Sequence, residues 1–356
     1  MTKEKIAVAM SGGVDSAVAA LLLKNEGHSL LGLTMRLWSE QEFLEDAENP
    51  LPDENAKDAA SIASLLDFPH KTVGFGARFR ACVIQNFLEE YEAGRTPNPC
   101  VVCNRTIKFG ALYERAMAEG CTSLATGHYA QLEQSASGEI LLKKATDISK
   151  DQSYFLWSLP KEILPHIRFP LGNYTKPEIR AIAAEHGFVS AHRSDSQDIC
   201  FIPNGDYVSF MKRYSPKNFP EGYFVTPDGR VLGRHSGIIR YTIGQRKGLG
   251  IAVGSPIFVG SKNMQNNTVT LCSDQELYHK HLTAKQINLF VSDLPIAPLR
   301  LEAKIRYRHA PAMATVEQIG EDRLAVTFDE PQRAIAPGQS LVLYDGDTVI
   351  GGGIIE

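Results

Sequence analysis

The segment with the clearest chemical potential is the hexapeptide Ser11-Gly12-Gly13-Val14-Asp15-Ser16, which stands between an apolar run at 6–10 and a helical pattern at 17–23. Backbone N–H groups converge at the start of a helix and favour anions there. The two glycines permit close approach of a phosphate, and the serine hydroxyls can donate hydrogen bonds to it. A plain Gly-Gly turn capped by serine is the alternative, but the strand–loop–helix context favours a phosphate cradle. The loop lacks the lysine that ends a Walker A loop.

Two of the six cysteines lie in segments that suit thiol chemistry. Cys103 follows the proline-punctuated stretch 94–99 and precedes a helix that we expect to begin near Ile107. Prolines restrict the backbone, and a helix N-terminus favours thiolate over thiol. Cys200 follows a polar, turn-prone stretch, and a flexible segment suits a thiol that moves between partners. We predict reactive roles for these two, whereas the apolar patterns around Cys82, Cys121 and Cys272 predict structural roles.

The elements that must position these residues alternate along the first 130 residues. Strands are expected at 6–10, 30–35, 70–73 and 123–126, and helices at 17–23, 58–66, 79–91 and, further on, 176–185. This alternation is typical of a parallel sheet flanked by helices, so we expect an α/β fold with an N-terminal doubly wound parallel sheet. Between Glu40 and Glu54, seven acidic residues and no Lys or Arg predict an exposed loop.

The pattern changes after about residue 203. Glycine and proline become dense from Asn204 to Tyr278, which favours a small β-rich module with tight turns. Short, evenly spaced strands from His281 onward favour a small C-terminal barrel. We therefore expect three domains, at 1–203, 204–280 and 281–356.

Composition and charge exclude few functions. The chain has 356 residues, 43% hydrophobic and 22% charged, which argues against collagen, coiled coil and global disorder. Its 37 Lys+Arg against 41 Asp+Glu give a net charge of −4, although a local basic stripe can still bind nucleic acid. No run approaches the roughly 18 apolar residues that span a bilayer, and no signal peptide is evident. We expect a cytoplasmic protein without a membrane partner.

The hexapeptide resembles the PP-loop of the N-type ATP pyrophosphatases, a superfamily that binds ATP in a doubly wound domain and uses it to adenylate a substrate oxygen. The resemblance implies ATP as cofactor, and Asp15 would help hold Mg²⁺ on the phosphates because hard cations prefer oxygen ligands. The residues implied for ATP binding are Ala9, Met10, Ser11, Gly12, Gly13, Val14, Asp15, Ser16, Met35 and Gly127. The superfamily includes amide-forming synthetases as well as sulfur transferases, so the loop alone does not identify the substrate.

Eight ordered segments extend the resemblance over nearly the whole chain. They are SGGVDS at 11–16, GRTPNPCVVCNRTIKFG at 94–110, ATGHYA at 125–130, KDQSYFL at 150–156, DSQDICFI at 195–202, TIGQRKGLG at 242–250, KIRYRHAP at 304–311 and APGQS at 336–340. In this order they are similar to the segments of tRNA-specific 2-thiouridylases. The resemblance implies an ATP-dependent enzyme that converts the C2 oxygen of uridine 34 in certain tRNA anticodons to sulfur.

The same resemblance implies a two-cysteine relay. Cys200 matches the persulfide carrier, and Cys103 matches the nucleophile that resolves the persulfide, so that a Cys103–Cys200 disulfide forms as sulfur is released. A persulfide donor or relay protein and a thiol reductant are thus implied as partners beside tRNA. The residues implied for tRNA contact are Asn98, Pro99, Cys100, His128, Lys150, Asp151, Gln152, Gln245, Arg246, Lys247, Arg306, Tyr307, Arg308 and Gln339. We expect 304–309 to alternate as a strand, with Lys304, Arg306 and Arg308 on one face.

One departure from the family pattern leaves alternatives open. Cys100 stands where some relatives carry an aspartate proposed as general acid or base, a role that a thiol fills only if its pKa is tuned toward neutrality. With Cys103 and Cys200 it also makes three thiolates, the number that leaves one iron of a [4Fe–4S] cluster open to a sulfide. Thiolation through such a cluster is one alternative. An amide-forming synthetase and a non-catalytic, nucleotide-sensing RNA-binding module are the others.

Overall fold

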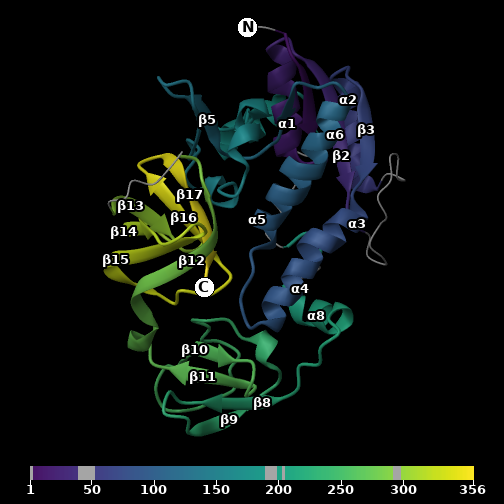
Figure 1. The fold of residues 1–356 in the computed structure, drawn as a ribbon. Coiled ribbons are helices and arrows are strands. Elements are labelled where there is room, and N and C mark those ends of the chain that lie inside the picture. The colour runs from purple at the N-terminus through teal and green to yellow at the C-terminus, as the bar shows by residue number, and fades with distance from the viewer. Residues whose placement is uncertain (1–2, 39–52, 189–198, 203–204, 292–297) are drawn as a thin grey trace. The chain divides into compact units, whose positions relative to one another are not determined.

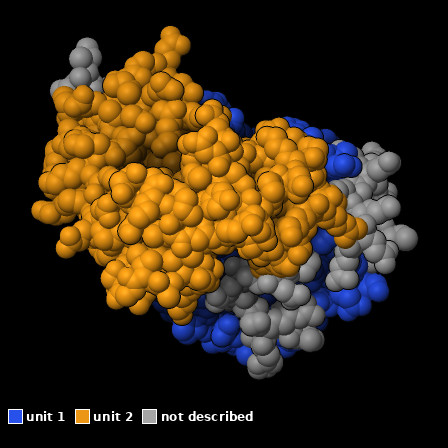
Figure 2. Space-filling view, turned by 90° about the horizontal axis from the view of Figure 1, so that it is seen from below, with its two compact units in different colours: residues 1–83, 100–197, 346–349 blue, residues 84–99, 198–345, 350–356 orange. Residues whose placement is uncertain are grey.

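The computed structural model describes residues 3–38, 53–188, 199–202, 205–291 and 298–356. The chain divides into two compact units, which Figure 2 colours separately. Unit 1 comprises residues 1–83, 100–197 and 346–349, and unit 2 comprises residues 84–99, 198–345 and 350–356. Most of the expected acidic loop at 40–54 lies outside the described residues.

Unit 1 is built on a five-stranded sheet (Figure 1). Its strands are β1 (Lys5–Ala9), β2 (Ser29–Arg36), β3 (His70–Gly74), β4 (Ser123–Ala125) and β7 (Ile167–Arg168). They lie in the order β3-β2-β1-β4-β7, and every pairing is parallel. The parallel sheet predicted for the N-terminal part is therefore confirmed.

The helices of unit 1 bury apolar faces against this sheet. They are α1 (Val14–Asn25), α2 (Glu54–Leu65), α3 (Gly76–Phe79), α5 (Pro99–Cys103), η2 (Asn104–Leu112), α6 (Tyr113–Ala118) and α7 (Lys176–Glu185), with short turns η1 (Arg80–Ile84), η3 (Ser153–Phe155) and η4 (Lys161–His166). Residues of α1, α2 and α7 share one hydrophobic core with β1 and β2. The helix predicted from residue 58 begins at Glu54 because Asp53 caps it, its carboxylate accepting from the Ala56 N–H at 2.8 Å.

The middle of unit 2 carries a four-stranded sheet in the order β10-β11-β8-β9. Its strands are β8 (Gly222–Val225), β9 (Val231–His235), β10 (Phe258–Asn263) and β11 (Thr268–Cys272). The helices α4 (Gln85–Glu92) and α8 (Tyr207–Tyr214) and the turns η7 (Ile238–Arg240) and η8 (Gln275–Leu277) complete this part of unit 2. The glycine-rich stretch is thus β-rich, as its composition predicts.

A closed six-stranded barrel follows. Its strands are β12 (Tyr278–Leu289), β13 (Leu299–Lys304), β14 (Ala312–Gln318), β15 (Arg323–Arg333), β16 (Ser340–Asp345) and β17 (Thr348–Ile355). The antiparallel pairing of β12 with β17 closes the ring and confirms the predicted barrel. In unit 1, the hairpin β5 (Gln131–Gln134) and β6 (Ile140–Lys143) meets the first residue of β17, where Thr348 pairs with Lys143.

The strand predicted over 304–309 is wrong beyond its first residue. Strand β13 ends at Lys304, and residues 305–309 form a turn in which the His309 N–H donates to the Arg306 carbonyl at 3.1 Å. Ile305 is 1% exposed and belongs to the barrel core, so the chain turns with this side chain held inside. No helix among the described residues is long and apolar enough to cross a membrane.

Candidate active site

The phosphate loop joins β1 to α1 at the carboxyl end of the parallel sheet, where ligands bind in open α/β folds. Gly13 is the N-cap of α1 and has an extended backbone, with φ −87° and ψ 165°. Gly12 has φ +72°, and a Cβ there would approach the Asn55 carbonyl oxygen to 2.6 Å. Both the backbone angle and the close approach require glycine at position 12.

The two loop serines have different surroundings. Ser16 is buried, and its hydroxyl accepts from the Ser11 N–H at 3.2 Å and donates to the Gly13 carbonyl at 3.0 Å. Ser11 is exposed. The Ser16 side chain therefore braces the loop from within. The Ser11 hydroxyl lies 3.4 Å from the Ser16 hydroxyl on the exposed side of the loop.

Gly127 supports the loop from behind. A Cβ at this position would lie 3.0 Å from the Asp15 carbonyl carbon and from the Ser16 nitrogen, so the segment after β4 packs directly on the loop backbone. The other residues implied for ATP binding sit at or next to the strand ends and at the first turn of α1. These are Ala9, Met10, Val14 and Met35.

Asp15 is held by two side chains from distant parts of unit 1. The Lys176 ammonium lies 2.8 Å from each carboxylate oxygen, and the Tyr129 hydroxyl donates to Oδ1 at 2.8 Å. The Lys176 side chain is 7% exposed. Sequence reasoning missed Lys176, although a signal was present, because a lysine in the first turn of a helix opposes the helix dipole and needs a local reason to be there.

This arrangement does not fit Asp15 as a Mg²⁺ ligand. Both of its oxygens already accept hydrogen bonds, and the cation beside them is an ammonium. Within the part of the chain that the structure describes, no three His, Cys, Asp or Glu side chains gather into a metal-binding group. Of the three cysteines expected at a [4Fe–4S] site, Cys100 and Cys103 belong to unit 1 and Cys200 belongs to unit 2.

Cys100 and Cys103 lie on α5, one turn apart and on one helix face. The predicted helix start near Ile107 is wrong, because the helix begins at Pro99, where the missing N–H of proline costs no hydrogen bond. Cys103 is 9% exposed, and Cys100 is exposed. Figure 1 shows α5 leading into the same helical run as α6, through η2, whose π-type turns often mark functional sites.

The pKa of the Cys100 thiol differs from that of an ordinary thiol. Desolvation by the surrounding protein raises the pKa of Cys100, and the positive charge of Lys108 acts in the opposite direction. Since an ordinary thiol already has a pKa above 8, Cys100 is a neutral thiol at pH 7. Such a group can donate a proton but is a poor base.

Lys108 also approaches His128. Its ammonium lies 3.4 Å from Nε2, while Nδ1 of His128 lies 2.7 Å from the Thr126 hydroxyl. The imidazole is 8% exposed and packs against the rings of Phe109 and Phe169. Burial first, and the Lys108 charge second, lower the pKa of His128 well below its usual value, so the ring is neutral. The sequence alone does not predict this contact between Lys108 and His128.

The 145–156 segment is held by its own side chains. The buried Asp151 carboxylate accepts from the N–H groups of Ala145 and Ser153 at 3.0 and 3.2 Å, and Gln152 Oε1 accepts from the Tyr129 N–H at 2.9 Å. Asn104, directly after Cys103, donates to the Phe155 carbonyl at 3.0 Å. The hydrogen bond from Asn104 thus ties the helical run that carries the cysteines to the 145–156 segment. Lys150 of this segment is half-buried.

Cys200 lies in unit 2 and is exposed. Its neighbour Phe201 is 1% exposed and packs edge-on against Phe87 of α4, with ring centroids 5.4 Å apart, and against Phe210 of α8. The exposed Cys200 is therefore followed directly by a buried residue, Phe201, whose packing holds this part of the backbone in place. The polar stretch that precedes it, 189–198, lies outside the described residues. All six cysteines are among the described residues, and none forms a disulfide.

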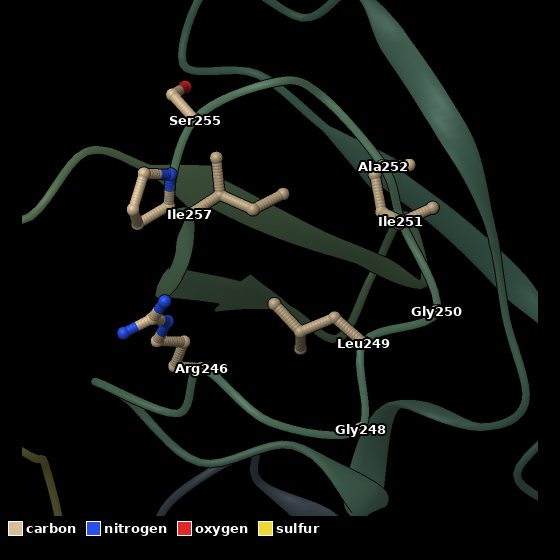
Figure 3. A pocket seen from close by; sticks show the side chains of 9 residues that line it. Arg246, Gly248, Leu249, Gly250, Ile251, Ala252, Ser255 and Ile257 are labelled. Atoms are coloured by element: carbon tan, nitrogen blue, oxygen red, sulfur yellow. The ribbon is translucent and has the colours of Figure 1, made fainter.

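The 242–250 segment of unit 2 forms a turn that carries Arg246 and Lys247, both exposed. Gln245 shapes this turn, because its side chain accepts from the Thr242 N–H and donates to the Lys247 carbonyl, each at 3.0 Å. Figure 3 shows Arg246 at the edge of a hollow into which the side chains of Leu249 and Ile257 project. The hollow measures about 350 Å³, and its lining combines aliphatic side chains with polar groups that include Arg246 and Ser255.

The basic residues Arg306 and Arg308 of the barrel differ in their surroundings. The Arg306 guanidinium donates to the carbonyl oxygens of Arg333 and, at 2.9 Å, Ala334, and so closes the turn within the barrel. Arg308 is exposed, and Tyr307 stands under the Lys304 ammonium, 5.6 Å from ring centroid to nitrogen. Gln339 donates its side-chain amide to the Thr96 carbonyl at 2.8 Å, so it contacts the segment that leads to Asn98 and Pro99.

Comparison with known proteins matches the chain from end to end. Family models match residues 4–204 (described as a tRNA methyl transferase HUP domain), 208–273 (a tRNA methyl transferase PRC-barrel domain) and 279–355 (an aminomethyltransferase β-barrel domain). A protein described as tRNA-specific 2-thiouridylase MnmA from Clostridioides difficile strain 630 is 46% identical over 354 residues, covering 99% of this chain and 98% of that protein. Relatives with the same description from Acetivibrio thermocellus and Koribacter versatilis are 44% and 45% identical, covering 100% and 99% of this chain and 100% and 99% of their own lengths.

Proposed function

The chain belongs to the tRNA-specific 2-thiouridylases, and we propose that it uses ATP to replace the C2 oxygen of uridine 34 in tRNA with sulfur. One observation carries the proposal: the braced phosphate loop and the Cys100–Cys103 helix face belong to the same compact unit. A nucleotide cradle alone serves many adenylating enzymes. A nucleotide cradle combined with a cysteine pair on one helix face serves sulfur chemistry.

The first step activates the base. The C2 oxygen attacks the α-phosphorus of ATP, the bond to the β-phosphate oxygen breaks, and pyrophosphate leaves. The amide-like oxygen, which leaves poorly by itself, then departs readily as part of AMP. In this step the N–H groups at the start of α1 and the Ser11 hydroxyl bind phosphate oxygens, while Ser16 and Gly127 keep the loop in shape.

The second step transfers sulfur. The terminal sulfur of a persulfide on Cys200 attacks C2, and the Cys103 thiolate attacks the Cys200 sulfur, breaking the sulfur–sulfur bond. The electron pair released onto the sulfur attached to C2 forms the C=S bond as AMP leaves. A Cys103–Cys200 disulfide results, and a thiol reductant returns it to two thiols. A donor protein then reloads Cys200.

Cys100 takes part as an acid rather than as a base in this scheme. Its neutral thiol can protonate a leaving or developing anion, whereas an aspartate at the same position would be ionised at pH 7. Mg²⁺ held by Asp15 is not part of the proposal, because both oxygens of this carboxylate already accept hydrogen bonds. Thiolation through a [4Fe–4S] cluster held by Cys100, Cys103 and Cys200 stays an alternative to the persulfide relay.

The tRNA would be held by residues from all three proposed domains, 1–203, 204–280 and 281–356. Cations at the surface neutralise phosphates without reading sequence. This role suits the exposed Arg246, Lys247 and Arg308 and the half-buried Lys150. Asn98, Pro99, Cys100 and the neutral His128 would surround the unstacked uridine, which must leave the anticodon stack to react. Since tRNA is cytoplasmic, we expect the reaction there.

Release of pyrophosphate tests the proposal and distinguishes it from other adenylating functions. Purified protein with ATP should release pyrophosphate only when a tRNA transcript with uridine 34 is added, and a transcript with cytidine 34 should not support release. Cys103→Ser should retain one tRNA-dependent release per active site but form no 2-thiouridine. Turnover at the wild-type rate in Cys103→Ser would indicate an amide-forming synthetase, and the absence of any release would indicate a non-catalytic nucleotide-binding module.

A further inference from the structure

Lys108 places a positive charge on the helical run of unit 1 that carries Cys100 and Cys103. Residues Asn104–Leu112 form the π-type turns of η2, and such a turn takes about one residue more than an α-turn, so Lys108 comes about one turn after Cys103. The two cysteines and the lysine therefore follow one another along the same side of the run. In agreement, the pKa of Cys100, which desolvation raises, is lowered by the charge of Lys108.

A neutral imidazole holds the Lys108 ammonium, whose nitrogen lies 3.4 Å from Nε2 of His128. Burial first, and the Lys108 charge second, keep the pKa of His128 well below its usual value, so the ring carries a single N–H. Because an ammonium can only donate, Nε2 is the accepting nitrogen, and Nδ1–H donates to the Thr126 hydroxyl at 2.7 Å. The contact uses one of the N–H donors of Lys108 and neutralises none of its charge.

The imidazole itself is fixed inside unit 1. Its ring centroid lies 5.7 Å from that of Phe109 and 6.0 Å from that of Phe169, and His128 is 8% exposed. Lys108 is half-buried and so reaches further toward solvent. A ligand at this place would meet the ammonium, and His128 would act on the ligand through Lys108.

The charge of Lys108 has no counter-ion in the part of the chain that the structure describes, where no carboxylate forms an ion pair with it. A partly buried charge is costly unless it is paired, so an anion bound here would be stabilised. The phosphate loop contains no lysine, and the ammonium beside it, that of Lys176, is already paired with Asp15. Lys108 therefore remains available to an anionic ligand.

The position of His128 indicates which anion this is. His128 directly follows Gly127, where a Cβ would lie 3.0 Å from backbone atoms of Asp15 and Ser16 in the phosphate loop. The residue that holds Lys108 is thus joined to the support of the phosphate loop, whereas Lys108 belongs to the run that carries the thiols. In the proposed reaction, the α-phosphate connects the nucleotide in the loop to the base that the thiols attack.

We propose that Lys108 is a catalytic residue that binds an α-phosphate oxygen of the nucleotide, and that His128 is the positioning residue that holds its ammonium. This assignment rests on the proposed function. When the bond between C2 and its oxygen breaks, the electron pair leaves with AMP, and the ammonium stabilises the negative charge that appears on the phosphate. Lys108 keeps its proton throughout, and the attacking sulfur supplies the electron pair of the new bond to C2.

Binding of AMP and of adenosine tests the contact without tRNA and without thiolation. Lys108→Met removes the charge and keeps most of the side-chain length. Lys161→Met is the matched control, because Lys161 is a half-buried lysine of the same unit whose ammonium pairs with Glu139 at 2.9 Å. NMR titration measures both affinities for each protein, and Lys108→Gln replaces Lys108→Met if the latter fails to fold.

We expect Lys108→Met to weaken AMP binding by at least about tenfold, the loss of one charge-assisted hydrogen bond. Adenosine, which carries no phosphate, should bind equally well to Lys108→Met and to the wild type. Lys161→Met should bind both compounds like the wild type. Wild-type AMP affinity in Lys108→Met, or an equal loss of AMP and adenosine affinity, overturns the proposal.

Variants of His128 test its positioning role. His128→Gln offers an amide oxygen that can still accept from Lys108, so its AMP affinity should stay close to that of the wild type. His128→Leu offers no acceptor and should weaken AMP binding, with no further loss when it is combined with Lys108→Met, because both changes remove the same contact. Additive losses, or wild-type AMP affinity in His128→Leu, overturn the positioning role.

The salt dependence of tRNA binding separates a nucleotide phosphate from a phosphate of the tRNA backbone. A backbone contact would leave the AMP affinity of Lys108→Met unchanged and reduce the slope of log Kd against log salt by about one, which overturns the assignment. Single-turnover thiolation at saturating ATP and tRNA should fall on the order of a hundredfold in Lys108→Met, and an unchanged rate overturns the catalytic role. Failure of the proposed function gives a different result: the wild type forms no 2-thiouridine, while its AMP affinity still exceeds that of Lys108→Met.

Discussion

The Lys176 ammonium lies 2.8 Å from both carboxylate oxygens of Asp15, although 161 residues separate the two in the chain. The pair places a cation next to a phosphate loop that contains none of its own. It also connects the N-terminus of α7 to the first turn of α1. Tyr129 completes the contact by donating to Asp15 and by placing its ring 5.7 Å from the ammonium. The loop is thus shaped by residues that no local motif contains.

Removing the Lys176 charge should loosen the phosphate loop. We expect Lys176→Met to lower the free energy of unfolding by about 2–3 kcal/mol, below the usual effect of breaking a fully buried pair because Asp15 is about one-third exposed. ATP affinity should fall by at least about tenfold, since the loop loses both its brace and its neighbouring cation. Chemical denaturation and equilibrium dialysis with ATP measure the two effects. Lys24→Met is the matched control, at a half-buried lysine of α1 whose ammonium donates to the Asp67 carbonyl. If Lys176→Met has the stability and the ATP affinity of the wild type, then the Lys176–Asp15 pair does not stabilise the phosphate loop.

The thiol of Cys100 should label only at alkaline pH. Because desolvation raises the pKa of Cys100, its alkylation rate should reach half-maximum at a higher pH than that of a thiol in an unfolded peptide. Lys108 lowers that pKa, so Lys108→Met should raise it further and slow labelling at pH 8. A pH series of iodoacetamide labelling, resolved by peptide, measures both shifts. Lys71→Met, far along the chain and paired with Glu119, should leave the Cys100 profile unchanged. Faster labelling in Lys108→Met would contradict the electrostatic account.

The two barrel arginines should separate tRNA binding from stability. We expect Arg308→Ala to weaken tRNA binding and to reduce the slope of log Kd against log salt by about one, the loss of one phosphate contact, with a smaller change in Tm than Arg306→Ala. Arg306→Ala should instead lower Tm, because it leaves the Arg333 and Ala334 carbonyls without their donor. Filter binding at several salt concentrations and thermal denaturation distinguish the two. Equal tRNA affinities for wild type and Arg308→Ala would remove this turn from the tRNA surface.

Arg246 should contribute to tRNA affinity in the same electrostatic way. Arg246→Ala should reduce the salt dependence of binding by about one phosphate contact, whereas Arg230→Ala, an exposed arginine of the same sheet region, should not. Gln245→Ala gives a different expectation. Its side chain shapes the turn through Thr242 and Lys247, so its loss should affect affinity only by displacing Arg246. Identical salt slopes for Arg246→Ala and the wild type would exclude this turn from the tRNA surface.

Local signals allowed much of the fold to be predicted from the sequence. The phosphate loop, the parallel sheet and the helix at 176–185 follow from periodicity, glycines and a capping box, all of which act over a few residues. The errors also have local causes. Pro99 marks a helix start as readily as a loop, and the apolar Ile305 sits inside a turn, where alternation alone predicts a strand.

The parts of the site that could not be predicted depend on long-range contacts. Lys176 meets Asp15, Lys108 meets His128, and Gln339 meets Thr96 only after strands and helices far apart in the chain have packed. Nothing in the immediate sequence around Gln339 distinguishes a residue that binds tRNA from one that binds a neighbouring backbone. A glutamine side chain can hydrogen-bond to RNA or to a protein backbone equally well. Which of the two it does depends on the groups that the tertiary structure places next to it.

Nucleoside mass spectrometry of tRNA tests the central claim most directly. The protein, loaded with persulfide by a donor, is incubated with ATP and an unmodified transcript that carries uridine 34, and the digested nucleosides are quantified. We predict ATP-dependent 2-thiouridine at position 34 with the wild type and with Cys121→Ser, a buried cysteine outside the site. We predict none with Cys103→Ser or Cys200→Ser. Absence of 2-thiouridine with the wild type, or its formation at the wild-type rate without Cys103, would contradict the account.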